Sequence, residues 1–328
     1  MSFSAKVKEE LGRQVSLARH CQLAEFAALF LLCGKVKKSS REKISLEIHT
    51  ENLTVVKKSY ILLKMAFDTS IEIRIRNHSL GSYTPTYFLV IQDQAAVMQI
   101  LKAVKLLDET GNRWGDFSGI PHRLVQNTCC KRAFLRGVFM VAGSVTNPKK
   151  GYHLEIAVTS EGLCRQLQEM VLSFGIEAKI VERKKYYVLY VKEGSLIVDF
   201  LNVMEAHLAL MEFENVRILK DVRNSVNRQV NCETANINKT VTAAARQIED
   251  IRYIERRKGF RQLNDGLREI AELRLDYPDS SLAELGQMLS KPLGKSGVNH
   301  RLRKLSNIAD GLRKQQALFP DPKEDERS

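Results

Sequence analysis

The sequence predicts an α+β protein in which a duplicated α/β unit precedes an all-α domain. The chain has 328 residues, a length sufficient for about two domains. Its composition, with 44% hydrophobic and 27% charged residues, is typical of a globular protein. One stretch recurs after 109 residues, and from about residue 215 the pattern becomes almost wholly helical. We expect a repeated domain over 1–212, a linker over 213–230, a helical domain over 231–314 and an acidic flexible tail over 315–328.

The repeat begins with an apolar helix. Two stretches align at the constant offset, AEFAALFLLCGKV at 24–36 and AFLRGVFMVAGSV at 133–145. Gly34 therefore meets Gly143, and Cys21 meets Cys130. Small residues in both helices, such as Ala28 and Gly137, would let two helix backbones approach closely. The alternative is that each helix is the core of a separate domain, but the repeat favours a pseudo-dimer packed about the two helices.

Both copies, at about 20–107 and 129–209, continue with the same order of predicted elements. A basic loop and a strand with the sequence Leu-Glu-Ile precede a helix of apolar period near 3.6. Two strands and a closing helix follow. The strands are expected at 71–76, 83–91, 176–182 and 186–191, and the closing helices at about 94–107 and 195–209. Each copy thus has the order α-β-(β)-α-β-β-α.

This repeat resembles the LAGLIDADG homing endonucleases, in which two such helices form the interface and two four-stranded sheets form a saddle over DNA. On the nine-residue motif of that family the copies are FAALFLLCG at 26–34 and LRGVFMVAG at 135–143. The metal-binding aspartate of the family falls on Cys33 and Ala142. A thiol and a methyl group cannot replace the hard carboxylate oxygens that hold Mg²⁺ and activate water. The resemblance therefore implies the scaffold without its nuclease chemistry, so these are vestigial positions and no catalytic residue is expected.

Basic residues on the predicted strands are candidates for secondary DNA contacts. They are Arg74, Arg76, Arg183, Lys184 and Lys185. They are equally typical of solvated strand faces and of charges that protect sheet edges. Protein binding through the saddle is a further alternative, so the sequence leaves the role of this half open.

The strongest local signal lies between Ser280 and Lys314. Ser281-Leu282-Ala283-Glu284 is a capping box, which predicts the start of a short helix. A break at 290–294 separates it from a second helix that begins near Ser296 and runs through Leu305. Its apolar residues Val298, Leu302 and Leu305 share one face. A short helix, a turn and an amphipathic helix in this order form the helix-turn-helix layout.

The other face of this second helix carries residue types suited to DNA. Arg pairs with guanine and Asn with adenine, and Lys neutralises phosphates. The predicted DNA-binding residues are Ser281, Lys291, Lys295, Ser296, Asn299, His300, Arg301, Arg303 and Lys304. Residues 285–309 contain five Lys or Arg and no Asp or Glu, whereas ordinary solvated faces mix both signs. The alternative is a plain helical packing module.

Charge and cysteine content narrow the classes of partner. There are 51 Lys and Arg against 38 Asp and Glu, a net charge of +13, which favours nucleic acid first and an acidic membrane surface second. The helical region 217–314 carries +8 in 98 residues, whereas 1–216 carries +7.

None of the six cysteines forms a CxxC pair, so we expect reduced thiols and neither a metal nor a cofactor. No signal peptide or spanning segment is evident, so we expect a cytoplasmic protein with no membrane partner. The predicted DNA binding implies that it is nucleoid-associated, and no small-molecule substrate is evident.

Nearly the whole chain, about 5–310, resembles the WhiA family. Besides the degenerate repeat, the resemblance rests on NCETAN at 231–236, NKT at 238–240, RQIEDI at 246–251 and KSGVNHRL at 295–302. It implies a Gram-positive bacterial DNA-binding regulator of cell division, chromosome segregation and, in spore formers, sporulation. In actinomycetes it implies a WhiB-type iron–sulfur partner, although nothing in this sequence identifies one.

The favoured hypothesis is a non-enzymatic, sequence-specific protein that binds double-stranded DNA and regulates transcription. One alternative is an RNA-binding or nucleoid-associated basic protein, which predicts aromatic stacking platforms on the strands. The other is a residual metal-dependent nuclease with relocated acids.

Overall fold

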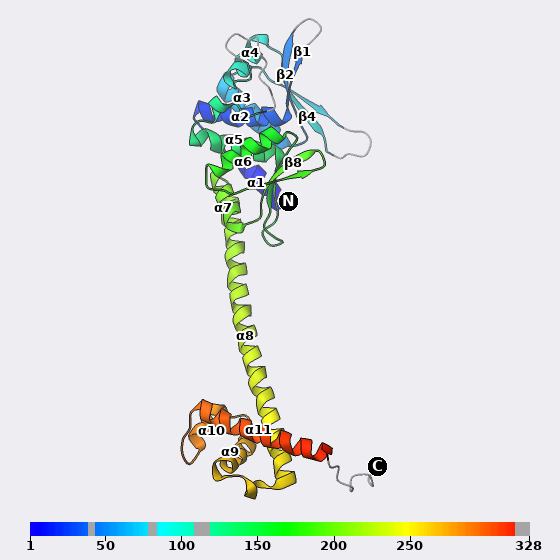
Figure 1. The fold of residues 1–328 in the computed structure, drawn as a ribbon. Helices are drawn as coiled ribbons and strands as arrows, with labels where there is room; N and C mark the ends of the chain where they lie inside the picture. Colours follow the sequence, from blue (N-terminus) through cyan, green and yellow to red (C-terminus); the bar gives the residue numbers. More distant parts are fainter. Residues whose placement is uncertain (39–42, 78–83, 108–118, 319–328) are drawn as a thin grey trace. The chain divides into compact units, whose positions relative to one another are not determined.

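The computed structural model describes residues 1–38, 43–77, 84–107 and 119–318 and divides the chain into two compact units (Figure 1). Unit 1 is Met1–Asp221 and unit 2 is Val222–Ser328. Unit 1 holds two four-stranded antiparallel sheets with their helices, and the described part of unit 2 is helical. The predicted α+β fold class is confirmed. Most of the acidic tail expected at 315–328 lies outside the described residues. No helix in the described ranges is long and apolar enough to cross a membrane.

The two repeats have the same element order, α-β-β-α-β-β-α. In the first repeat the elements are α2 (Arg19–Cys33), β1 (Gly34–Lys38), β2 (Ile44–Thr50), α3 (Leu53–Phe67), β3 (Glu72–Arg76), β4 (Thr86–Ile91) and α4 (Gln94–Ala103). In the second they are α5 (Thr128–Ala142), β5 (Gly143–Val145), β6 (Leu154–Val158), α6 (Glu161–Leu172), β7 (Lys179–Arg183), β8 (Tyr186–Val191) and α7 (Gly194–Val203). The strand orders β1-β2-β4-β3 and β5-β6-β8-β7 are equivalent.

Strand β7 begins three residues later than the sequence predicts. Gly175 has a φ of +78°, and the amide of Ile176 donates to the carbonyl of Val171 at 3.2 Å. This closing turn satisfies a free carbonyl at the end of α6 and keeps Ile176 out of the strand. The predicted start of the 83–91 strand, residue 83, lies outside the described ranges.

Helices α2 and α5 pack side by side at the centre of unit 1 (Figure 1). A Cβ at Gly137 would lie 2.7 Å from the carbonyl oxygen of Glu25 and 2.8 Å from the Cβ of Ala28. The two backbones thus approach as closely as the small residues allow. The expectation of a pseudo-dimer about these helices is confirmed. Helix α1 (Phe3–Arg13), which precedes the first repeat, buries Phe3, Val7 and Leu11 against the same core.

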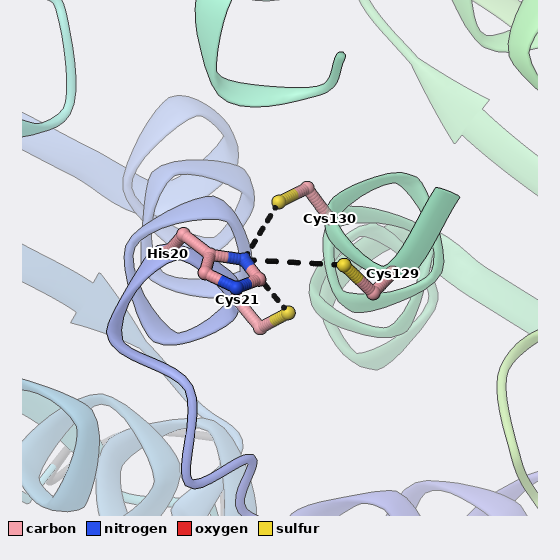
Figure 2. A group of neighbouring side chains, drawn as sticks. All are labelled: His20, Cys21, Cys129 and Cys130. Atoms are coloured by element: carbon pink, nitrogen blue, oxygen red, sulfur yellow. Dashed lines mark hydrogen bonds between the residues drawn. The ribbon is translucent and has the colours of Figure 1, made fainter. Parts of the chain in front are cut away.

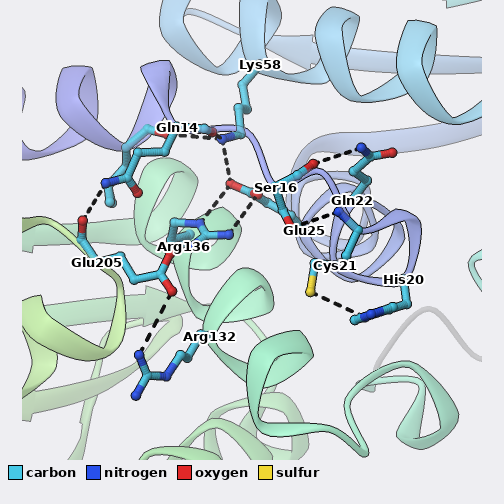
Figure 3. Close-up of polar contacts among 12 residues, drawn as sticks. Gln14, Ser16, His20, Cys21, Gln22, Glu25, Lys58, Arg132, Arg136 and Glu205 are labelled. Atoms are coloured by element: carbon cyan, nitrogen blue, oxygen red, sulfur yellow. Dashed lines mark hydrogen bonds and ion pairs between the residues drawn. The ribbon is translucent and has the colours of Figure 1, made fainter.

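A buried ion network crosses the interface between the two helices (Figure 3). Glu25 on α2 and Lys58 on α3 are completely buried and pair at 2.9 Å. Arg136 on α5, whose side chain is 4% exposed, contacts the same carboxylate at 3.4 Å and also pairs with Glu205. Lys58 donates further to the carbonyls of Leu11 and Gln14. Burial lowers the pKa of Lys58, and Glu25 opposes that shift. The Glu25 carboxylate therefore contacts two buried cations from different repeats, and Glu205 is a second partner of Arg136.

Helix α8 (His207–Lys258) is continuous over 52 residues. It runs through 213–230, so the segment expected as a linker is helical. The helix ends at Lys258, and the next residue, Gly259, has a φ of +70°. Ile237 and Val241 have the apolar spacing of a helix face but are 62% and 61% exposed, and burial in the second half of α8 begins only near Ile251.

Unit 2 begins at Val222 within α8, and its core is formed by the end of α8 and the helices that follow it. Its further elements are η2 (Phe260–Gln262), α9 (Asp265–Asp276), α10 (Leu282–Met288) and α11 (Lys295–Leu318). Ile251 and Ile254 of α8 share a core with Ile270 of α9 and Leu285 of α10. Asp250, which is 1% exposed, pairs with Arg313 at 2.7 Å and so fixes α11 to α8.

Candidate nucleic-acid interface

Helix α10 begins at the predicted capping box. The hydroxyl of Ser281 accepts a hydrogen bond from the amide of Glu284 at 3.3 Å, and the amide of Ser281 donates to the Glu284 carboxylate at 2.7 Å. These two bonds satisfy two free amides at the helix start. The side chain of Ser281, a predicted DNA-binding residue, is therefore used within the domain.

The turn between α10 and α11 is tight. Gly286 is buried, and its carbonyl accepts a hydrogen bond from the amide of Leu293 at 2.9 Å. A Cβ at Gly286 would lie 2.1 Å from the carbonyl oxygen of Leu293, so only glycine fits here. The Glu269 carboxylate of α9 accepts from the amide of Ser290, and this bond lowers the pKa of Glu269. Both contacts fix the direction in which α11 leaves the turn.

The first half of α11 has two sharply different faces. Val298, Leu302 and Leu305 are at most 1% exposed, as the sequence predicts. The exposed positions follow at the spacing of one helix face, i, i+3, i+4, i+7, i+8 and i+11. They are Ser296, Asn299, His300, Arg303, Lys304 and Asn307. We call this set the α11 polar stripe. It holds amides, a hydroxyl, an imidazole and two cations, and no carboxylate.

The other predicted residues lie in and beside the turn. Lys291 and Lys295 are exposed. Arg301 is half-buried, and its Nη1 donates to the carbonyl of Gly266 at 3.1 Å. It therefore joins α11 to α9, a contact that the residue type alone does not reveal. Helix α11 also continues to Leu318, well beyond the predicted end near Leu305.

The basic residues predicted on the sheets have local partners. On β3, Arg74 pairs with Glu72 at 2.7 Å, and Arg76 lies over the ring of Phe88 with its guanidinium carbon 5.0 Å from the centroid. The Arg74 guanidinium lowers the pKa of Glu72. Their register with Phe88 and Thr86 places both arginines on one face of the sheet, opposite the core face of Leu89.

The second sheet has a comparable pattern. Arg183 pairs with Glu155 at 3.2 Å, and His153 contacts the same carboxylate at 3.0 Å. Lys184 occupies the β7–β8 turn with a φ of +56°, and the ammonium of Lys185 lies 5.9 Å from the ring centroid of Tyr186. Paired charges make this face less basic than its sequence implies.

The vestigial positions end the two central helices. Cys33 is the last residue of α2 and Ala142 the last of α5. The thiol of Cys33 donates to the carbonyl of Leu29 at 2.9 Å, and burial raises its pKa to about 12. A protonated thiol and a methyl group offer no hard anionic ligand for Mg²⁺. The only group of three or more close His, Cys, Asp or Glu in the described part of the chain lies at the N-terminal ends of these helices and contains no carboxylate.

These features define the class of protein: a duplicated LAGLIDADG-like scaffold without the acids of its motif, joined to a helix-turn-helix domain. Three domain families match the chain. They are the WhiA N-terminal LAGLIDADG-like domain at 19–107, the WhiA LAGLIDADG-like domain at 131–223 and the WhiA C-terminal HTH domain at 226–309.

Relatives match over nearly the full chain. A probable cell division protein WhiA of Lachnoclostridium phytofermentans is 56% identical over 314 residues, which covers 95% of this chain and 100% of the relative. That of Alkaliphilus oremlandii is 49% identical over 313 residues, covering 95% and 98%. The crystal structure of full-length DUF199/WhiA from Thermotoga maritima has a TM-score of 0.57 at 25% identity, covering 95% and 99%. The chain belongs to the WhiA family.

Proposed function

We propose that this protein is a non-enzymatic regulator that binds specific sites in double-stranded DNA through the α11 polar stripe. The curated relatives are named probable cell division proteins, and we propose that the genes it controls serve cell division, chromosome segregation and, in spore formers, sporulation. On this proposal it acts in the cytoplasm, on the nucleoid.

The observation that carries the proposal is the separation of faces on α11. Its apolar side is fully used in the core of unit 2, so the stripe is free for a partner. Asn299 and Arg303 offer the amide and guanidinium that pair with adenine and guanine edges. Lys291, Lys295 and Lys304 are exposed around them and suit phosphates. The half-buried Arg301 supports the stripe through its bond to Gly266.

We also propose that the chain does not cleave DNA. Cleavage of DNA by this scaffold requires a carboxylate at the end of each central helix, and Cys33 and Ala142 occupy those positions. Supercoiled plasmid incubated with the purified chain and Mg²⁺ or Mn²⁺ should remain intact. Nicking that co-purifies with the chain and survives controls would overturn this part.

Binding of fluorescent duplexes tests the interface directly. Lys304→Ala should weaken binding to all sequences alike and reduce the slope of log affinity against log salt by about 1, because one phosphate contact is lost. Arg303→Ala should cost about 1–3 kcal/mol and relax specificity if it contacts a base.

Lys314→Ala is the matched control. It removes the same charge from an exposed position on the same helix, ten residues and about 15 Å further along. If Lys304→Ala and Arg303→Ala weaken binding no more than Lys314→Ala does, the assignment of the stripe is wrong. A preference for single-stranded RNA over duplex DNA would favour the RNA-binding alternative.

A further inference from the structure

Four metal-ligating side chains meet at the N-terminal ends of the two central helices (Figure 2). His20 and Cys21 lie in the first turn of α2, and Cys129 and Cys130 lie in the first turn of α5. Their ligand atoms all lie within 4.8 Å of one another. The Nδ1 atom of His20 is 3.2 Å from the Sγ of Cys130, 3.3 Å from that of Cys21 and 3.9 Å from that of Cys129. We call these four residues the Cys₃His cluster.

The spacing of the cluster fits one tetrahedral ion. With Zn–S near 2.3 Å and Zn–N near 2.0–2.1 Å, a nitrogen and a sulfur on one tetrahedral zinc lie about 3.6 Å apart. The three observed nitrogen–sulfur distances bracket this value. Three thiolates and one imidazole form a common closed structural zinc set. We propose that His20, Cys21, Cys129 and Cys130 bind a single Zn²⁺ ion that joins the two repeats.

The surroundings favour a negatively charged site. Three thiolates, a neutral imidazole and Zn²⁺ carry a net charge of about −1. Both helices begin at the cluster, so their partial positive charges lie beside it. The first turns of α2 and α5 contain no acidic residue, and Arg19, Lys131 and Arg132 flank the ligands in sequence.

Thiol ligands must lose their protons to bind a metal ion, so binding of Zn²⁺ to this cluster should release protons.

Exposure provides a path of entry for the ion. Cys21 and Cys130 are each 4% exposed and pack with Ala24 and Ala133 in a small buried layer of their own. His20 and Cys129 are exposed. Two ligands are therefore fixed in the interface, and the other two close over the ion from the solvent side.

The cluster follows the internal repeat. At the offset of 109, His20 corresponds to Cys129 and Cys21 to Cys130. Each repeat therefore supplies two ligands from equivalent positions, at the end of the central helices opposite to Cys33 and Ala142. Zinc motifs are normally found from short ligand spacings, so the sequence led us to expect reduced thiols and no metal. The offset that pairs Cys21 with Cys130 was the available signal.

Metal titration of the full chain tests the proposal independently of DNA binding. Chelator-treated, reduced protein should bind one equivalent of Co²⁺, with thiolate-to-cobalt charge transfer and the intense d–d bands of a tetrahedral site. Zn²⁺ should abolish these bands by displacement, and one zinc should raise the urea midpoint of unit 1 because it binds only the folded form.

Variants identify the ligands. Cys130→Ser removes a direct ligand, so it should raise the dissociation constant of Zn²⁺ by more than about 10–100-fold, which is the cost of losing a residue that only hydrogen-bonds to a ligand. Cys129→Ser and His20→Ala change exposed positions and should fold normally while losing the tetrahedral spectrum. Cys232→Ser, at an exposed cysteine of α8, is the matched control and should bind as the parent does.

Three results would overturn the proposal. The first is a reduced chain that binds no stoichiometric Co²⁺ or Zn²⁺. The second is a loss of binding in Cys232→Ser as large as that in Cys130→Ser. The third is the recovery of Cys130 mainly as a disulfide with Cys21 or Cys129 after rapid alkylation of cells, because the cluster would then be a redox pair.

Discussion

The buried carboxylate of Glu25 provides the sharpest test of how the two repeats are held together. Glu25→Gln keeps the shape of the side chain but leaves Lys58 without a counter-charge and Arg136 with only its pair to the partly exposed Glu205. At an effective dielectric constant of about 20, unit charges about 3 Å apart attract by roughly 5 kcal/mol. Desolvation offsets part of this attraction, and removal of one partner from a buried pair costs about 3–5 kcal/mol. We expect unit 1 to lose that much free energy of unfolding.

Urea denaturation of the full chain, followed by circular dichroism, measures this loss as a shift of the unfolding transition of unit 1. With a slope of about 3 kcal/mol/M, the midpoint should fall by about 1–1.7 M. Glu9→Gln is the control, because Glu9 makes an exposed pair with Arg13 whose loss should cost no more than about 0.5 kcal/mol. An equal shift in both variants would refute the reasoning.

Two further predictions concern the helix interface and the turn. Gly137→Ala should destabilise unit 1 by about 1–3 kcal/mol or more in the same assay, because its Cβ would meet the backbone of Glu25. Gly162→Ala in the first turn of α6 is the control: apart from neighbouring residues and the helix's own backbone, the nearest atom to its Cβ would lie 3.8 Å away, so it should stabilise by at most about 0.5–1 kcal/mol. Because the pKa of Glu269 is lower in the folded state, its ionised carboxylate stabilises unit 2 at pH values above the unfolded pKa near 4.5. This contribution is lost as the pH falls through the folded pKa. Glu269→Gln should therefore be less stable at pH 7 and less sensitive to acid, and an unchanged acid-unfolding curve for unit 2 would contradict this.

Features with local or repeated signals could be predicted from the sequence. The constant offset identified the two repeats, and the capping box at Ser281 located the start of α10. The apolar positions Val298, Leu302 and Leu305 identified the buried face of α11. Each signal depends on residues that lie within one helix or recur at one spacing.

Features that depend on tertiary contacts were missed. The partner of Arg301 is a backbone carbonyl 35 residues away, and the four side chains of the Cys₃His cluster come from two different helices. The continuous helix α8 was missed because a polar, basic segment is also typical of a linker. Its signal was the lack of any Gly or Pro between Gly194 and Gly259. Ile237 and Val241 have helical apolar spacing and yet are exposed, so periodicity alone did not decide burial.

The most direct test of the proposed recognition is to map the sequences bound by the full chain on fragmented genomic DNA from its own host. The α11 polar stripe predicts discrete sites that share a motif. The double variant Asn299→Ala, Arg303→Ala should keep salt-sensitive general binding and lose the motif. The same motif and the same sites for the double variant would contradict the claim that α11 recognises the DNA sequence.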